Sequence, residues 1–326
     1  MNPAHTMQTC LPRLAWIGLA LASIIPLAAA PKIGVVLQGP KASSVWNSFA
    51  NGATEAGAKA NAEIIVKAPP IDFSAAYQLK LLAALTDQSL DALVIAPPAT
   101  ANEPFDLELA KAIEAFAKKG TKVVVAGMGP LPGFANTTVI IDQDQLAQIG
   151  AQRLAEIVTA DDEVGILRTY TPDGFTPREK LAMKDVRARF PKIKIYADIS
   201  IPAGDRSGVE QAKRLLTQYP KISVAYTTMT VSSLAMIQAL KDMKLAGKVK
   251  HVGYGMELDA TTAAALESGD MTMLFSQDFH SYGVKAVETA LALIKGEQLP
   301  PVIKVDFTVI TKDNIAAEKA KMNARK

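Results

Sequence analysis

Short apolar runs rich in Val and Ile alternate along the chain with longer segments in which apolar residues recur at helical spacing. The short runs show little polar alternation, which is typical of parallel strands covered by helices on both faces. The strands predicted in this way are Ile33–Gln38, Glu63–Lys67, Ala92–Ile95, Lys122–Ala126, Thr138–Ile141, Glu163–Leu167, Lys194–Ile199, Ser223–Thr227, His251–Gly255 and Met273–Phe275. A last strand is expected near Val305–Ile310.

The segments between these runs predict helices. Leu79, Leu82 and Leu85 share one helical face, and Ser207–Gln218 and Ser232–Lys241 have the same spacing. Strand, helix and strand in this order predict βαβ units with right-handed crossovers. The number of predicted strands is too large for one small sheet. We therefore expect an α/β fold of two doubly wound parallel-sheet (αβα) lobes.

The N-terminus has the features of an export signal. Arg13 is the only Lys or Arg before Lys32, and an apolar run from Leu14 ends in the small residues at Ala30. Residues 1–30 are therefore predicted to be a signal peptide that is removed, with an uncleaved membrane anchor as the alternative. Removal would take away Cys10, the only cysteine, and leave a mature chain without thiol or disulfide chemistry.

Composition narrows the class of partner. The chain has 326 residues, 49% hydrophobic and 21% charged, with a formal net charge of +3. These values are typical of a globular protein. They give no basic excess of the kind that phosphate backbones require, so no nucleic acid is expected as a partner.

Familiar catalytic and cofactor motifs are not supported. The glycine-rich segment from Gly127 to Gly133 carries Pro130 and Pro132 where a pyrophosphate would need amide donors. His251 and His280 have no partner at metal-ligand spacing, so no metal is expected. No Gly-x-Ser-x-Gly elbow marks a nucleophile. We therefore expect no cofactor and no enzyme activity.

Polar and aromatic residues follow several predicted strands. In open α/β sheets, small ligands bind outside the carboxyl ends of the strands. The candidate site residues at these positions are Ser44, Trp46, Tyr170, Phe175, Arg178, Tyr254 and Gln277. Each has an ordinary alternative, since a lone Trp at a helix start is more often a packing residue and a lone Arg more often a surface ion-pair residue.

Three segments resemble one family in their order and spacing. They are KIGVVLQGPKASSVWNSFANGATEAGAKANAEIIV, DALVIAPPA and VGYGMELDATTAAALESGDMTMLFSQDFHSYGVKAVETALALIKGE. Together they are similar to the type I periplasmic solute-binding proteins, in particular the ribose-binding branch, over nearly the whole mature length. The resemblance implies a periplasmic protein that closes two lobes around a small polar solute.

The resemblance also implies roles for individual residues. Trp46 falls where an aromatic ring of the family stacks on the ligand, Arg178 where an arginine donates to ligand oxygens, and Gln277 at a contact beside the hinge. Tyr170, Phe175 and Tyr254 are candidates for the walls of the cleft, and Ser44 is a further candidate ligand contact after the first strand.

The chain departs from the sugar-binding pattern at four positions. Gly127, Met128, Met229 and Gly255 stand where members of the family usually carry Asp, Arg, Asn and Asp. A lost carboxylate contact removes charge-assisted hydrogen bonds of roughly 1.5–3 kcal/mol each. The resemblance therefore leaves open a sugar, a less hydroxylated solute, or an anionic solute balanced by Arg178.

The resemblance implies a particular lobe arrangement and partner. The N-terminal lobe would span 31–141 and 280–304, and the C-terminal lobe 142–277 and 305–326, joined by a three-crossover hinge. The implied partner is the membrane permease of an ATP-binding-cassette (ABC) transporter, and the implied state is a monomer. A sensor partner of a receptor histidine kinase or a chemoreceptor is the alternative that the sequence leaves open.

Overall fold

We describe the computed structural model of the chain. It describes Met1 and residues 29–72, 74–98, 106–127, 133, 135–169, 176–201 and 207–325. The expected export signal at 1–30 therefore lies almost wholly outside the described residues. The chain divides into two units, Met1–Ala30 and Pro31–Lys326, and both sheets lie in the second unit.

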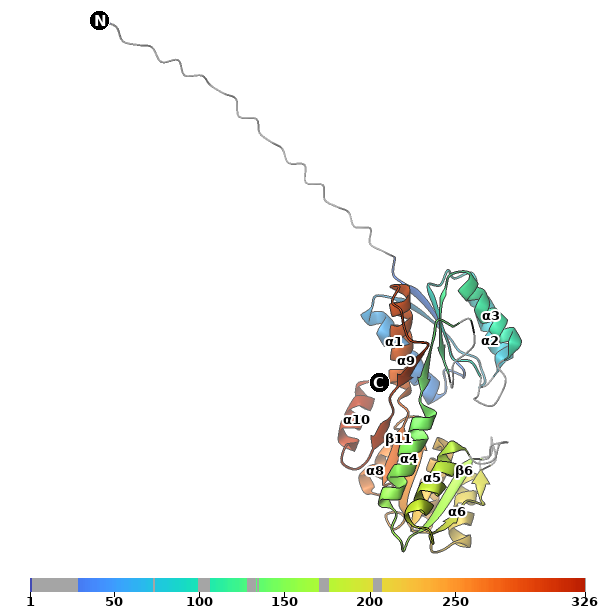
Figure 1. Cartoon of the computed structure of the whole chain (residues 1–326), viewed down its shortest axis with the longest axis vertical. Coiled ribbons are helices and arrows are strands. Elements are labelled where there is room, and N and C mark those ends of the chain that lie inside the picture. The colour runs from blue at the N-terminus through green and yellow to red at the C-terminus, as the bar shows by residue number, and fades with distance from the viewer. Residues whose placement is uncertain are drawn as a thin grey trace. The chain divides into compact units, whose positions relative to one another are not determined.

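The first sheet is built from strands on both sides of the chain's middle (Figure 1). Its described strands are parallel and lie in the order β12-β5-β4-β3-β1-β2. Their bounds are β1 Lys32–Val36, β2 Glu63–Lys67, β3 Ala92–Ile95, β4 Lys122–Ala126, β5 Thr137–Ile141 and β12 Val302–Val305. The helices packed on them are α1 Ser44–Lys59, α2 Ala75–Leu85, α3 Leu107–Lys118 and α9 Phe279–Ile294.

The second sheet follows the order β13-β11-β10-β9-β6-β7, and β8 pairs with β6. Its described strands are β6 Glu163–Thr169, β7 Lys194–Tyr196, β8 Ser200–Ile201, β9 Val224–Thr227, β10 Lys250–Gly255, β11 Met273–Ser276 and β13 Thr308–Ile310. Its helices are α4 Gln143–Ile157, α5 Pro177–Arg189, α6 Gly208–Gln218, α7 Thr230–Asp242, α8 Ala260–Ser268 and α10 Ile315–Ala324.

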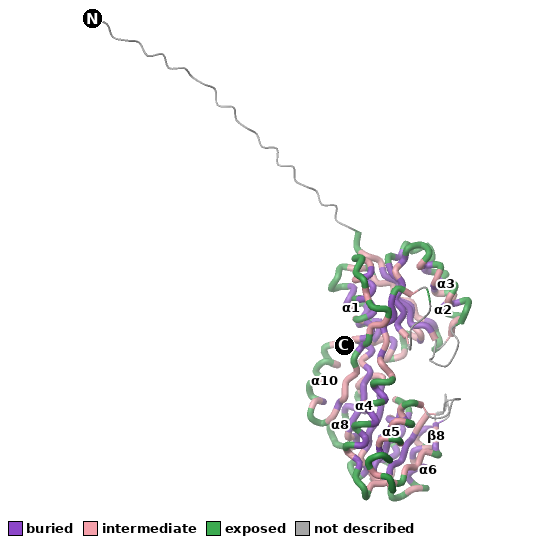
Figure 2. The backbone as a smooth tube through the Cα atoms, in the orientation of Figure 1, coloured by how far each residue is buried: buried purple, intermediate pink, exposed green. Residues whose placement is uncertain are grey.

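Alternate side chains of each sheet pack on helices of opposite faces. In the first sheet, Val35 and Val94 pack with α1 and α9, whereas Leu93 and Val125 pack with α2 and α3. The second sheet is covered in the same way by α4 and α5 on one face and by α6, α7 and α8 on the other. The purple buried segments in Figure 2 follow these strands. The predicted class, two αβα lobes, is confirmed.

The predicted last strand near Val305–Ile310 is shorter in the structure, where β13 spans Thr308–Ile310, and strand β12 at Val302–Val305 was not predicted. The chain ends β12 at Val305 in the first sheet and begins β13 at Thr308 in the second, where β13 runs antiparallel to β11. Asp306 and Phe307 carry the passage between the two sheets. Strand β12 was not recognised because the alternation of apolar and polar residues continues from β12 into β13.

Two glycines permit the closest helix packing in the first lobe. A Cβ at Gly52 of α1 would lie 2.1 Å from the carbonyl oxygen of His280, and a Cβ at Gly283 of α9 would lie 2.0 Å from that of Phe49. Real Cβ atoms cannot approach so closely. The two helices therefore cross backbone to backbone, which fixes the position of α9 directly after it leaves the second sheet.

Candidate functional site

A polar cluster lies at the carboxyl edge of the second sheet and centres on Arg178. This residue is in the first turn of α5, which begins at Pro177, and proline favours a helix start. The guanidinium donates hydrogen bonds to the carbonyl oxygen of Thr228, after β9, and to Oε1 of Gln143 at 2.7 Å. Its central carbon lies 4.3 Å from the centroid of the Tyr254 ring.

Gln143 connects Arg178 to Gln277. Nε2 of Gln143 donates to Oε1 of Gln277 at 3.0 Å. Gln143 opens α4 where the chain enters the second lobe, and Gln277 lies between β11 and α9 where the chain leaves it. Arg178 and Gln277, both candidates from the sequence, are thus linked by Gln143, which the sequence analysis did not identify. Its only signal was its place after strand β5, beside the helix-capping residue Asp142.

The ring of Tyr254 packs against the guanidinium of Arg178. It is fully buried, its hydroxyl lies 2.9 Å from that of Tyr226, and Gly150 of α4 leaves the space that this hydroxyl occupies. Burial raises the pKa of both tyrosines, so both stay neutral. The ring therefore acts on the site by stacking under Arg178, whereas the sequence suggested a side chain in the wall of a cleft.

The groups that contact the Arg178 guanidinium are neutral: a backbone carbonyl, a side-chain amide and a tyrosine ring. Among the described residues, no carboxylate forms an ion pair with the guanidinium. Burial lowers the pKa of Arg178, while the nearby Glu179 favours the charged form. Glu179 is fully buried, accepts a hydrogen bond from Thr176, and has one carboxylate oxygen without a partner in the described part of the chain. A guanidinium in this setting is suited to binding oxygen atoms of a solute.

Trp46 lies in the core of the first lobe. Its side chain is 8% exposed, packs edge-on against Phe49 and Phe279, and donates from Nε1 to Oδ1 of Asp72 at 3.1 Å. Gly39 leaves room for this pair, since a Cβ there would lie 1.8 Å from that oxygen. The indole is therefore held from two sides at the carboxyl edge of β1 and β2.

Of the remaining candidate residues, Ser44 lies within the described residues and two others do not. Ser44 is exposed at the first position of α1. Tyr170, Phe175 and Met128 lie outside the described residues. The other departures from the sugar-binding pattern are placed at the same sheet edges, with Gly127 after β4, Met229 after β9 and Gly255 at the end of β10.

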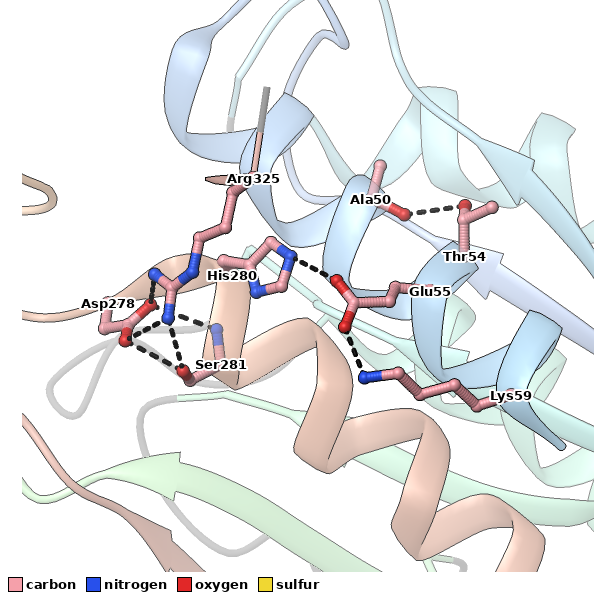
Figure 3. A network of polar contacts seen from close by, with 8 residues as sticks. All are labelled: Ala50, Thr54, Glu55, Lys59, Asp278, His280, Ser281 and Arg325. Atoms are coloured by element: carbon pink, nitrogen blue, oxygen red, sulfur yellow. Dashed lines mark hydrogen bonds and ion pairs between the residues drawn. The ribbon is translucent and has the colours of Figure 1, made fainter. Parts of the chain in front are cut away.

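A second polar cluster ties the crossovers together. Asp278, the capping residue of α9, accepts two hydrogen bonds from Arg325 at 2.7 and 3.1 Å and caps the N–H of Ser281 (Figure 3). In the same view, His280 lies against Glu55 of α1 at 3.1 Å. These groups border a surface hollow of about 640 Å³. Most of their charges are already paired, so this cluster has the character of a structural clasp.

The described residues hold neither a metal cluster nor a long apolar helix. No group of three His, Cys, Asp or Glu among them could bind a metal ion. His251 is fully buried, its Nε2 lies 2.9 Å from the Thr227 hydroxyl, and burial lowers its pKa to about 3. Within the same residues, every helix is too short or too polar to cross a membrane.

With the two lobes and the polar edge in place, the class of protein is defined. Residues 33–298 match the model of the periplasmic binding protein domain, and the chain belongs to that family.

Solved structures share the fold over most of the chain. A carbohydrate transporter solute-binding protein from Agrobacterium radiobacter, in complex with D-arabinose, is 23% identical with a TM-score of 0.71, covering 90% of this chain and 99% of that one. A periplasmic ribose ABC transporter protein from Conexibacter woesei is 18% identical, with a TM-score of 0.74 and coverage of 90% and 96%. An ABC transporter solute-binding protein from Agrobacterium vitis, bound to α-D-tagatopyranose, is 21% identical, with a TM-score of 0.70 and coverage of 89% and 98%.

Proposed function

We propose that the chain is the solute-capturing component of an ABC transporter in the periplasm and that it has no catalytic step. The observation that carries the proposal is the cluster of Arg178, Gln143 and Gln277, which sets a guanidinium fork and two amides at the carboxyl edge of a sheet, where α/β folds bind small ligands. The fold family and the sugar-binding neighbours support it. The partners are a small polar solute and a membrane permease, and the protein acts as a monomer.

The solute is a sugar or a sugar-like molecule, and Arg178 orients it. A guanidinium has five N–H donors, and the described contacts of Arg178 use its two terminal nitrogens. Gln143 and Gln277 offer amide groups that accept or donate to hydroxyls. An anionic group on the solute would complement the positive charge of Arg178, whose hydrogen-bond acceptors within the chain are neutral.

Binding is coupled to the crossovers. Gln143 and Gln277 belong to separate passages of the chain between the lobes, so a solute that contacts both fixes the two passages together. We propose that the lobes, with the bounds expected from the sequence, close on the solute and that residues 1–30 are removed as a signal peptide on export to the periplasm. Closure excludes water and strengthens each polar contact because the local dielectric falls.

The proposal is tested with the mature chain, residues 31–326. Pentoses, hexoses, polyols and sugar acids are titrated against it, and binding is followed by calorimetry and thermal shift. Arg178→Ala should weaken the best solute by about 10–100-fold, because each lost charge-assisted hydrogen bond contributes roughly 1.5–3 kcal/mol.

A matched control lies on the same helix. Arg189 at the far end of α5 donates to the carbonyl oxygen of Ala155 at 2.9 Å, away from the cluster. Arg189→Ala should leave solute affinity unchanged. Equal losses in both variants, or a solute whose binding ignores Arg178, would place the site elsewhere.

A further inference from the structure

Exposed apolar side chains gather at the carboxyl edges of the two sheets. Ile71 follows β2 and is 54% exposed, Leu107 opens α3, Met229 immediately precedes α7, and Val231 lies in the first turn of α7. Within the described residues of Pro31–Lys326, these and Tyr77, in the first turn of α2, make up the large apolar side chains that are left exposed. Single exposed apolar residues are common on any surface, but these share one kind of position in both lobes.

In the second lobe the apolar group adjoins the cation. Arg178 donates to the carbonyl oxygen of Thr228, and Met229 is the next residue, with 37% of its surface exposed. The loop is fixed, because the N–H of Met229 donates to the hydroxyl of Ser232 at 3.1 Å and the N–H of Met256 donates to that of Thr230 at 3.0 Å. The exposed Met229 therefore directly follows the residue that Arg178 contacts, in a loop held by hydrogen bonds.

The first lobe repeats the pairing. Ile71 precedes Asp72, whose carboxylate holds the indole N–H of Trp46. In each lobe, an exposed apolar residue is thus the sequence neighbour of a residue that accepts a hydrogen bond from a candidate site residue. A fully hydroxylated solute would lose water from its hydroxyls against these side chains without gaining a hydrogen-bond partner.

We propose that the solute is amphipathic, with a polar or anionic head held by Arg178 and an apolar portion that rests on Met229 and Val231. The inference rests on the proposed function and deepens it by naming the class of solute. Burying apolar surface stabilises a complex in proportion to the area removed from water. Met229 and Val231 provide such apolar surface, whereas groups that bind hydroxyls do not.

Matched pairs of probes test the inference on the mature chain. Hexanoate and D-gluconate are six-carbon carboxylates that differ in their hydroxyls, and L-fucose and L-galactose differ by one hydroxyl. We expect the less hydroxylated member of at least one pair to bind about tenfold more tightly in calorimetry. Met229→Gln, which keeps the length of the side chain but makes it polar, should reduce that ratio about tenfold.

The control applies the same substitution at the other end of α7. Met243 caps the C-terminus of that helix, so Met243→Gln should preserve the ratio of affinities even where it lowers thermal stability. A preference for the hydroxylated members, or a ratio that Met229→Gln leaves unchanged, overturns the inference and leaves solute capture standing. Failure of every solute in both this panel and the sugar panel to bind would count against both proposals.

Discussion

At the scale of single residues, burial decides the charge state of His251. The imidazole is enclosed in the second lobe, Nε2 pairs with Thr227, and Nδ1 has no partner among the described residues. The folded state therefore resists protonation, with a pKa of about 3 against 6.5 for a free side chain. The unfolded chain takes up the proton first, so stability due to this group is complete above pH 6.5 and falls as the pH is lowered toward 3.

We predict that this residue makes the free energy of unfolding fall by up to about 1.4 kcal/mol per pH unit below pH 6.5. Urea titrations between pH 7 and 4.5 measure it as the difference between the wild type and His251→Gln, which cannot titrate. The slope should be shallower in the variant, whatever its stability at pH 7. An NMR titration that showed the His251 ring protonating near pH 6 would contradict the prediction.

At the scale of elements, α4 and β10 meet at Gly150. A Cβ at this position would lie 1.7 Å from the hydroxyl oxygen of Tyr254, the ring that stacks under Arg178. Gly→Ala inside a helix is usually stabilising by about 1 kcal/mol. Here the close approach reverses that sign, because the ring or the helix has to move.

We predict that Gly150→Ala lowers the free energy of unfolding by about 1–3 kcal/mol, as overpacking does, and weakens solute binding through Arg178. Tyr254→Phe removes the atom that is approached most closely. The double variant Gly150→Ala with Tyr254→Phe should therefore be more stable than the sum of the two single changes implies. Strict additivity in denaturant unfolding would show that the clash is absorbed elsewhere.

The elements also show what the sequence could and could not predict. Unbroken apolar runs located the strands and the αβα layering because parallel strands need apolar residues on both faces. Strand β12 and the antiparallel direction of β13 were missed because one alternating run spans both strands. Gln143 was missed because a polar residue at a helix start reads as part of a cap. The partnership of Trp46 with Asp72 depends on a tertiary contact that no local pattern encodes.

At the scale of the whole molecule, the two lobes depend on each other because the chain passes between them repeatedly. Besides Gln143 with Gln277, the described contacts at these passages include Asp142 with Lys304 at 2.6 Å and Asp278 with Arg325. Arg325 follows α10, which packs with α8 of the second lobe, whereas Asp278 and Ser281 open α9 of the first. This clasp therefore joins the two lobes.

We predict that Arg325→Gln lowers the free energy of unfolding by about 1–2 kcal/mol, because it leaves a partly buried carboxylate without its charged partner. Lys319→Gln is the control, because it removes the ion pair between Lys319 of α10 and Glu267 of α8. That ion pair lies within one lobe and is more exposed, so its loss should lower the free energy of unfolding by less than about 0.5 kcal/mol. Burial raises the pKa of Asp278, but the hydrogen bonds from Arg325 and Ser281 outweigh it and hold this pKa below its usual 3.8. The clasp therefore stabilises above that pH and is lost as the pH falls through the folded value. The difference between the wild type and Arg325→Gln should therefore shrink below pH 3.8 in urea unfolding. Equal losses from Arg325→Gln and Lys319→Gln at pH 7 would mean that the clasp does not couple the lobes.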